Sequence, residues 1–93
     1  MAIQSFQCRD TQRLFEGESI RQFRSFETVA MRKLALLHRA ASLSDLRVPG
    51  GNRLEALSGD RAGQFSIRIN DQWRVCFVWT ALGPSSVEIV DYH

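Results

Sequence analysis

The residues best suited to chemistry gather in the last thirty positions of the chain. Arg68 and Arg74 stand in two successive strand-like segments, and the sequence ends at Tyr92 and His93 after a third such segment. A guanidinium can hold two phosphate oxygens, an imidazole transfers protons near neutral pH, and a tyrosine can hydrogen-bond a phosphate or stack on a base. Together these side chains suit metal-free cleavage of an RNA phosphodiester.

The alternation of apolar residues predicts where the two arginines lie. Apolar residues recur at every second position in the two strands around the turn, and we expect both sets to point at the helices. Opposed residues of an antiparallel pair share a face, which requires a three-residue turn, 70–72, with Ile69 opposite Trp73. Arg68 then lies opposite Arg74 on the other face.

Two like charges in register destabilise a sheet by about 0.2–1 kcal/mol. Two explanations would make the pair tolerable. Either a carboxylate of the chain, from Glu55, Glu88 or Asp91, neutralises the arginines, or an anionic ligand does so in a complex.

The composition indicates one folded domain over residues 1–93, with 44% apolar residues. No apolar run approaches the roughly 18–20 residues that span a bilayer. Residues 1–4 lead straight into a strand-like segment, so we expect no signal peptide, no membrane association and a cytoplasmic location.

Cys8 and Cys76 are too few for a disulfide scaffold, and no His, Cys or carboxylate cluster has metal-ligand spacing. We therefore expect neither a metal nor a cofactor.

The basic residues are unusual in type and in distribution. Eleven of the twelve are arginine, which indicates either a GC-rich genome or bidentate phosphate contacts. Residues 1–54 carry nine basic and five acidic groups, whereas residues 55–93 carry three and five. The positive first half favours a polyanion or an acidic partner.

The elements follow the order β-α-α-β-β-β-β, which predicts an α+β domain with two helices on one face of a mainly antiparallel sheet. The expected strands cover residues 3–6, 53–57, 64–69, 73–79 and, after a Gly83-Pro84 turn, 87–90. The expected helices cover residues 11–16, with Asp10 as N-cap and Gly17 as the end, and residues 26–41. Residues 18–24, 49–52 and 58–63 read as loops, and residues 44–46 as one further helical turn.

Several stretches together resemble a known family. They are Ile3-Gln4-Ser5-Phe6, Leu14-Phe15-Glu16-Gly17, the landmarks Gly59-Asp60 and Gly63 within residues 53–63, Trp73-Arg74 within residues 66–74, and the ending Asp91-Tyr92-His93. In these the chain resembles, nearly end to end, the HigB-type toxins of the RelE/ParE superfamily from bacterial toxin–antitoxin modules. The resemblance implies a small RelE-like fold and a ribosome-dependent mRNA endonuclease. It also implies neutralisation by a HigA-type helix-turn-helix antitoxin, in a complex that binds its own promoter DNA.

The chain departs from the family at one motif. Better-known ribonuclease members have His-Pro-Leu-Lys-Gly at residues 55–59, where this chain has Glu55 at the histidine position and Ser58 at the lysine position. The departure leaves three functions open. They are a metal-independent endoribonuclease with weaker or rearranged chemistry, a growth inhibitor that acts by binding a ribosome or a ParE-type target, and a regulator that acts only through antitoxin and promoter DNA.

The resemblance and the residues together give a candidate catalytic set. Arg74 matches the family's arginine after tryptophan and would stabilise the phosphate, and Tyr92 and His93 match its terminal pair, with His93 as acid or base. Arg68 is a second candidate cation, and Glu55 a candidate base in place of histidine.

Further basic residues are candidate RNA contacts. Arg61 stands in the loop beside residues 55–59, where its charge would replace that of the family's lysine. Arg53 precedes residues 55–59. Arg32, Lys33 and Arg39 form the outer face of the second helix, either as a solvated face or as contacts to ribosomal RNA.

Overall fold

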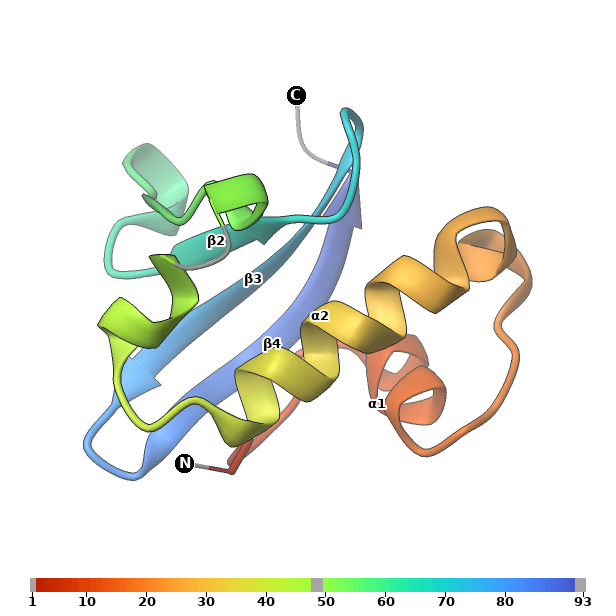
Figure 1. The fold of residues 1–93 in the computed structure, drawn as a ribbon, viewed down its shortest axis with the longest axis horizontal. Coiled ribbons are helices and arrows are strands. Elements are labelled where there is room, and N and C mark those ends of the chain that lie inside the picture. Colours follow the sequence, from red (N-terminus) through yellow and green to blue (C-terminus); the bar gives the residue numbers. More distant parts are fainter. Residues whose placement is uncertain (1, 48–49, 92–93) are drawn as a thin grey trace.

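The computed structural model describes residues 2–47 and 50–91 and has two layers, helices on a four-stranded sheet (Figure 1). The helices are α1 (Arg9–Phe15) and α2 (Glu27–Arg39), and the strands are β1 (Glu55–Ala56), β2 (Phe65–Arg68), β3 (Trp73–Thr80) and β4 (Gly83–Asp91). Short 3₁₀ turns occupy the connections: η1 (Arg21–Phe26), η2 (Leu43–Arg47), η3 (Gly50–Asn52) and η4 (Gly59–Arg61). The expected α+β class is confirmed.

The sheet runs in the order β1-β2-β3-β4 with every neighbouring pair antiparallel. Both helices lie on one face of it, with α2 crossing the strands (Figure 1). Leu34 and Leu37 of α2 are fully buried in one core cluster with Ile67, Val75 and Phe77 of the sheet. The alternating apolar positions of β2 and β3 therefore point at the helices, as their spacing predicts.

The strand expected over residues 3–6 is present only as a single parallel bridge, between Phe6 and Val87. Hydrogen bonds still tie this segment to β4, from the Gln4 amide to the Pro84 carbonyl at 2.7 Å and from the Val87 amide to the Ser5 carbonyl at 3.1 Å. The reason is a bulge in β4. The Ser86 amide there donates to the Ser5 hydroxyl instead of a main-chain acceptor, which interrupts the ladder.

The start of the first helix differs from the prediction. Asp10 is not the N-cap, because the helix begins at Arg9 after Cys8, which makes no side-chain cap. Asp10 instead lies in the first turn, 3.6 Å from Arg13 and accepting a hydrogen bond from Gln22. The helix ends at Phe15, one residue before the predicted end, and Gly17 follows with a φ of 104° that L-residues avoid.

The stretch expected as a polar loop, residues 18–24, contains most of the 3₁₀ turn η1. This turn buries Phe23 and Phe26, which contact Trp73 at ring-centroid distances of 5.9 and 5.1 Å. The two phenylalanines thus cover the end of the sheet at which β3 begins, and tertiary packing overrides the polar local sequence.

Strand lengths near the hairpin and the edge also differ. The edge strand covers only Glu55–Ala56 and not residues 53–57, since Arg53 adopts a φ of 47° that a strand excludes. The last strand begins at Gly83, directly opposite Thr80, so the turn lies at residues 81–82 and the expected Gly83-Pro84 turn is wrong. The expected turn over residues 44–46 is confirmed as part of η2.

Candidate functional site

The two strand arginines lie directly opposite each other, as the sequence predicts. Arg68 of β2 pairs with Arg74 of β3 in the antiparallel register. The Ile69 amide donates to the Trp73 carbonyl at 3.0 Å, which confirms the three-residue turn. Both side chains therefore lie on the face away from the helices, termed here the arginine face.

Arg74 is fixed on this face by two neutral acceptors. Its Nε donates to the Ser66 hydroxyl at 2.7 Å, and its Nη2 donates to the Arg53 carbonyl at 2.6 Å. The nearest carboxylate recorded for it is that of Glu55, with an oxygen 4.0 Å from Nη2. Only 11% of the Arg74 side chain is exposed. A guanidinium held by a hydroxyl and a carbonyl keeps its net charge while losing its freedom to rotate.

The ion pairs match the expectation only in part, because Glu55 lies at ion-pair distance from Arg74 but Arg68 has another partner. Arg68 pairs with the fully exposed Asp71 in the turn, not with Glu55, Glu88 or Asp91. Glu88 instead pairs with Arg61 at 2.9 Å. Arg68 and Arg74 therefore have different partners. The partner of Arg68, Asp71, was not among the carboxylates expected from the sequence.

Arg61 joins the arginine face from the η4 turn. Glu88, its partner, lies opposite Cys76 on β3, two positions after Arg74 on the same face. Burial raises the pKa of the Cys76 thiol, the charges of Arg61 and Arg74 lower it, and the charge of Glu88 raises it. Arg61, which the sequence suggested as a replacement for the lysine charge, therefore lies on the same face as Arg74 through its pair with Glu88.

Ser66 is the site residue that sequence reasoning did not identify. It is fully buried, because the stretch carrying Arg53 and Arg61 covers this part of the sheet. Its place on the strand, two positions before Arg68 and so on the same face, was the available signal. A serine on a strand is too common for that signal to single it out.

Of the three remaining catalytic candidates, Glu55 lies within the described residues. Glu55 stands opposite Ser66 and is about half exposed, at the edge of the arginine face. Tyr92 and His93 lie outside the described residues. The last described residue, Asp91, lies opposite Trp73, which directly precedes Arg74 on β3.

The candidates on α2 do not join this cluster, because α2 lies on the opposite face of the sheet (Figure 1). Arg32 and Arg39 are exposed there. Lys33 is half-buried and donates to the side-chain oxygen of Asn52. Burial lowers the pKa of Lys33, and the charges of Arg32 and Arg68 lower it further.

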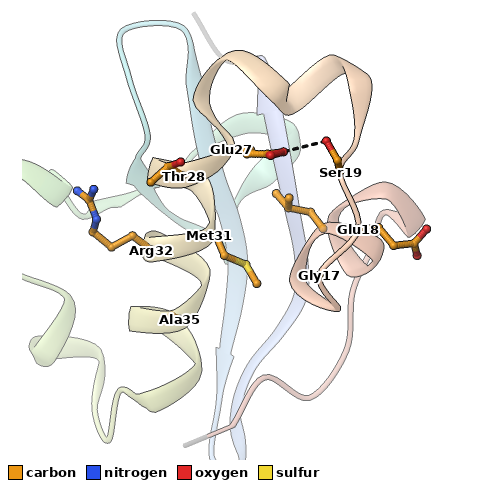
Figure 2. A pocket seen from close by; sticks show the side chains of 9 residues that line it. Gly17, Glu18, Ser19, Glu27, Thr28, Met31, Arg32 and Ala35 are labelled. Carbon is orange, nitrogen blue, oxygen red and sulfur yellow. Dashed lines mark hydrogen bonds between the residues drawn. The ribbon is translucent and has the colours of Figure 1, made fainter.

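An apolar groove of about 550 Å³ lies on the helix side, between α2 and the segment that follows α1 (Figure 2). Leu14, Met31 and Ala35 supply its apolar lining. A hydrogen bond of 3.1 Å from Ser19 to Glu27 spans one end of it. The groove shares no lining residue with the arginine face, so the two are separate features.

Across residues 2–47 and 50–91, no group of three or more His, Cys, Asp or Glu side chains is arranged to hold a metal ion. Within the same residues, no helix has the length and apolarity needed to cross a membrane.

Comparison with known proteins decides the family. Residues 4–93 match the family described as the RelE-like toxin of the type II toxin–antitoxin system HigB. The chain belongs to the HigB-like toxins. A relative, Toxin HigB-1 of Vibrio cholerae serotype O1 (strain ATCC 39315 / El Tor Inaba N16961), is 49% identical over 55 residues. That match covers 59% of this chain and 58% of the relative.

Membership in this family confirms the resemblance stated from the sequence. The family is described as the toxin component of type II toxin–antitoxin systems. The RelE-like description also agrees with the two helices and antiparallel sheet of the fold.

Proposed function

We propose that this HigB-like toxin is a metal-independent endoribonuclease that cleaves mRNA on the ribosome and is neutralised by a HigA-type antitoxin. RelE-like toxins are generally endoribonucleases, and the proposal assigns the cleavage to the arginine face. As the family resemblance implies, the toxin–antitoxin complex would also bind its own promoter DNA.

The orientation of Arg74 is the observation that carries this proposal. Two neutral acceptors hold its guanidinium, so its charge is available to an anion that approaches the remaining N–H groups. Arg68 lies across from it, and Arg61 is on the same face through its pair with Glu88, which lies opposite Cys76. A preorganised cation stabilises the extra negative charge that a phosphodiester acquires as the 2′-oxygen attacks.

The remaining roles follow from position. Arg68 and Arg61 would hold the flanking phosphates, since each has a carboxylate partner that an RNA phosphate can replace. Tyr92 and His93 follow Asp91 directly, and His93 would transfer the proton to the 5′-oxygen. Glu55, at the edge of the face, would take the proton of the 2′-hydroxyl.

The test is cleavage of a defined mRNA on purified ribosomes, with the cut ends mapped by primer extension. The wild-type chain is compared with Arg74→Ala and with a chain lacking His93, and Arg21→Ala is the control, because it removes an exposed arginine from η1 on the helix side. We expect cleavage about 100-fold slower without Arg74, since one stabilising donor accounts for about 10²–10³ in rate. Equal cleavage by all four chains would remove the proposed site.

A second function is favoured by one specific observation. Ser58, at the family's lysine position, is exposed and carries no charge, and Glu55 stands in place of histidine. If the loss of these two groups abolishes cleavage, the toxin would arrest growth by binding its target alone. Expression in cells separates the two functions: growth arrest with intact message, unchanged by Arg74→Ala, supports inhibition by binding.

A further inference from the structure

The segment between α2 and β1 holds Arg74 through its main chain. Arg53 adopts a φ of 47°, in the left-handed region that non-glycine residues rarely occupy. In this conformation its carbonyl accepts the 2.6 Å hydrogen bond from Arg74 Nη2. The direction of this acceptor is set by backbone angles, so whatever fixes the backbone at residue 53 also fixes one edge of the guanidinium.

The residue before Arg53 is fixed at both ends of its side chain. Asn52 is fully buried, and its Nδ2 donates to the Leu46 carbonyl at 3.1 Å. Its Oδ1 accepts a hydrogen bond from Lys33 Nζ, which reaches it from α2. A buried amide with both ends bound has a single orientation, and it transmits that orientation to the adjoining peptide.

These contacts form a continuous series from the helix layer to the arginine face. We infer that Lys33 and Asn52 are positioning residues for Arg74, because their hydrogen bond fixes the Arg53 carbonyl that, together with Ser66, holds the guanidinium in one orientation. This inference rests on the proposed cleavage at Arg74. It also gives Lys33 a role different from direct contact with RNA.

Two substitutions separate positioning from RNA contact. Lys33→Met keeps the hydrocarbon stem and removes the donor. Asn52→Ala interrupts the same series at a residue that carries no charge. Arg21→Met is the matched control, because it removes one positive charge from an exposed position on η1. Thermal melts of each purified chain establish that the variants are folded.

The first measurement is the Arg74 Nε–H signal in a ¹H–¹⁵N spectrum, assigned by its loss in Arg74→Met. In the wild-type chain we expect slow exchange with solvent, because this group donates to a fully buried hydroxyl. Lys33→Met and Asn52→Ala should each shift the signal and speed its exchange by about tenfold, whereas Arg21→Met should leave it unchanged.

The second measurement is the cleavage rate of ribosome-bound mRNA. Both variants should lower kcat by about tenfold with KM within about twofold, since misorientation weakens an interaction made in the transition state. A raised KM with unchanged kcat and an unchanged Arg74 signal would show that Lys33 contacts RNA, and would overturn the inference. An unchanged signal in both variants would overturn it as well.

The two proposals fail in distinguishable ways. If the wild-type chain does not cleave the message, the proposed function is wrong; if it and Arg74→Met cleave equally, the assignment of cleavage to Arg74 is wrong. In both cases the Arg74 Nε–H signal still reports whether Lys33 and Asn52 orient the guanidinium. If one variant does not fold, the other supplies the same comparison.

Discussion

The hydrogen bond between Arg74 and Ser66 should be among the strongest single interactions on the sheet. It joins a charged donor to a fully buried hydroxyl at 2.7 Å. Hydrogen bonds to charged groups contribute about 1.5–3 kcal/mol. In a double-mutant cycle, Arg74→Met and Ser66→Ala each lose this bond, and the double variant loses it only once, so the coupling energy should be about 1.5–3 kcal/mol.

Urea unfolding followed by tryptophan fluorescence measures this coupling, because Trp73 and Trp79 both pack against the core. Small domains lose about 1–3 kcal/mol of unfolding free energy per molar urea. A coupling near 2 kcal/mol therefore corresponds to roughly 0.7–2 M in the transition midpoint.

The Arg68–Asp71 pair is the internal control for this cycle. Asp71 is fully exposed, and exposed ion pairs contribute about 0–1 kcal/mol. Arg68→Met also relieves the repulsion from the opposed Arg74 by about 0.2–1 kcal/mol. A coupling below about 0.5 kcal/mol for Arg74–Ser66, or one no larger than that of the control pair, would refute the idea that Ser66 holds the guanidinium.

Four further predictions concern other groups of the molecule. Burial raises the pKa of the Cys76 thiol, so above about pH 9 the unfolded chain releases this proton while the folded chain keeps it. The unfolding free energy should therefore fall as pH rises above about 9. Urea unfolding at several pH values should show a smaller fall of this free energy in Cys76→Ala. Alkylation of the folded chain should modify the half-exposed Cys8 well before the buried Cys76. The backbone amides of Ala41 and Ser42 lower the pKa of Asp45. Its contribution to the unfolding free energy is therefore present above about pH 3.8 and is lost as pH falls through the lowered pKa. In thermal melts, Asp45→Ala should lose less stability on acidification than the wild-type chain. Ser86 has a φ of 51°, and Ser86→Gly should raise the unfolding free energy by about 1 kcal/mol; a decrease would show that its hydroxyl matters more than the strain.

The strand register is the part of the candidate site that could be predicted from the sequence. Side chains alternate with a period of two, so burying the apolar positions of both strands fixes which residues are opposed. Arg68 and Arg74 follow directly from that rule. The second helix was predictable for a similar reason, because a period near 3.6 identifies the face that holds Leu34 and Leu37.

Other elements were not predictable from local sequence. Phe23 lies in a stretch expected as a polar loop, and Phe23 and Phe26 of the observed 3₁₀ turn pack on Trp73, which is distant in sequence. Asp10 has the residue type of an N-cap, but the helix begins two residues earlier than predicted, and the Asp10 carboxylate accepts a hydrogen bond from Gln22. In both cases partners distant in sequence supply more free energy than the local preference does.

The sequence by itself determined the family, the α+β class and the pairing of the two arginines, because these depend on motifs and on short-range periodicity. The tertiary structure alone decided how Arg74 is held. Its acceptors are the Ser66 hydroxyl and the Arg53 carbonyl, and the second is set by a left-handed backbone beside a buried asparagine. Every residue has a main-chain carbonyl, so the residue type does not indicate which carbonyl accepts the hydrogen bond from Arg74. Only the folded structure identifies it.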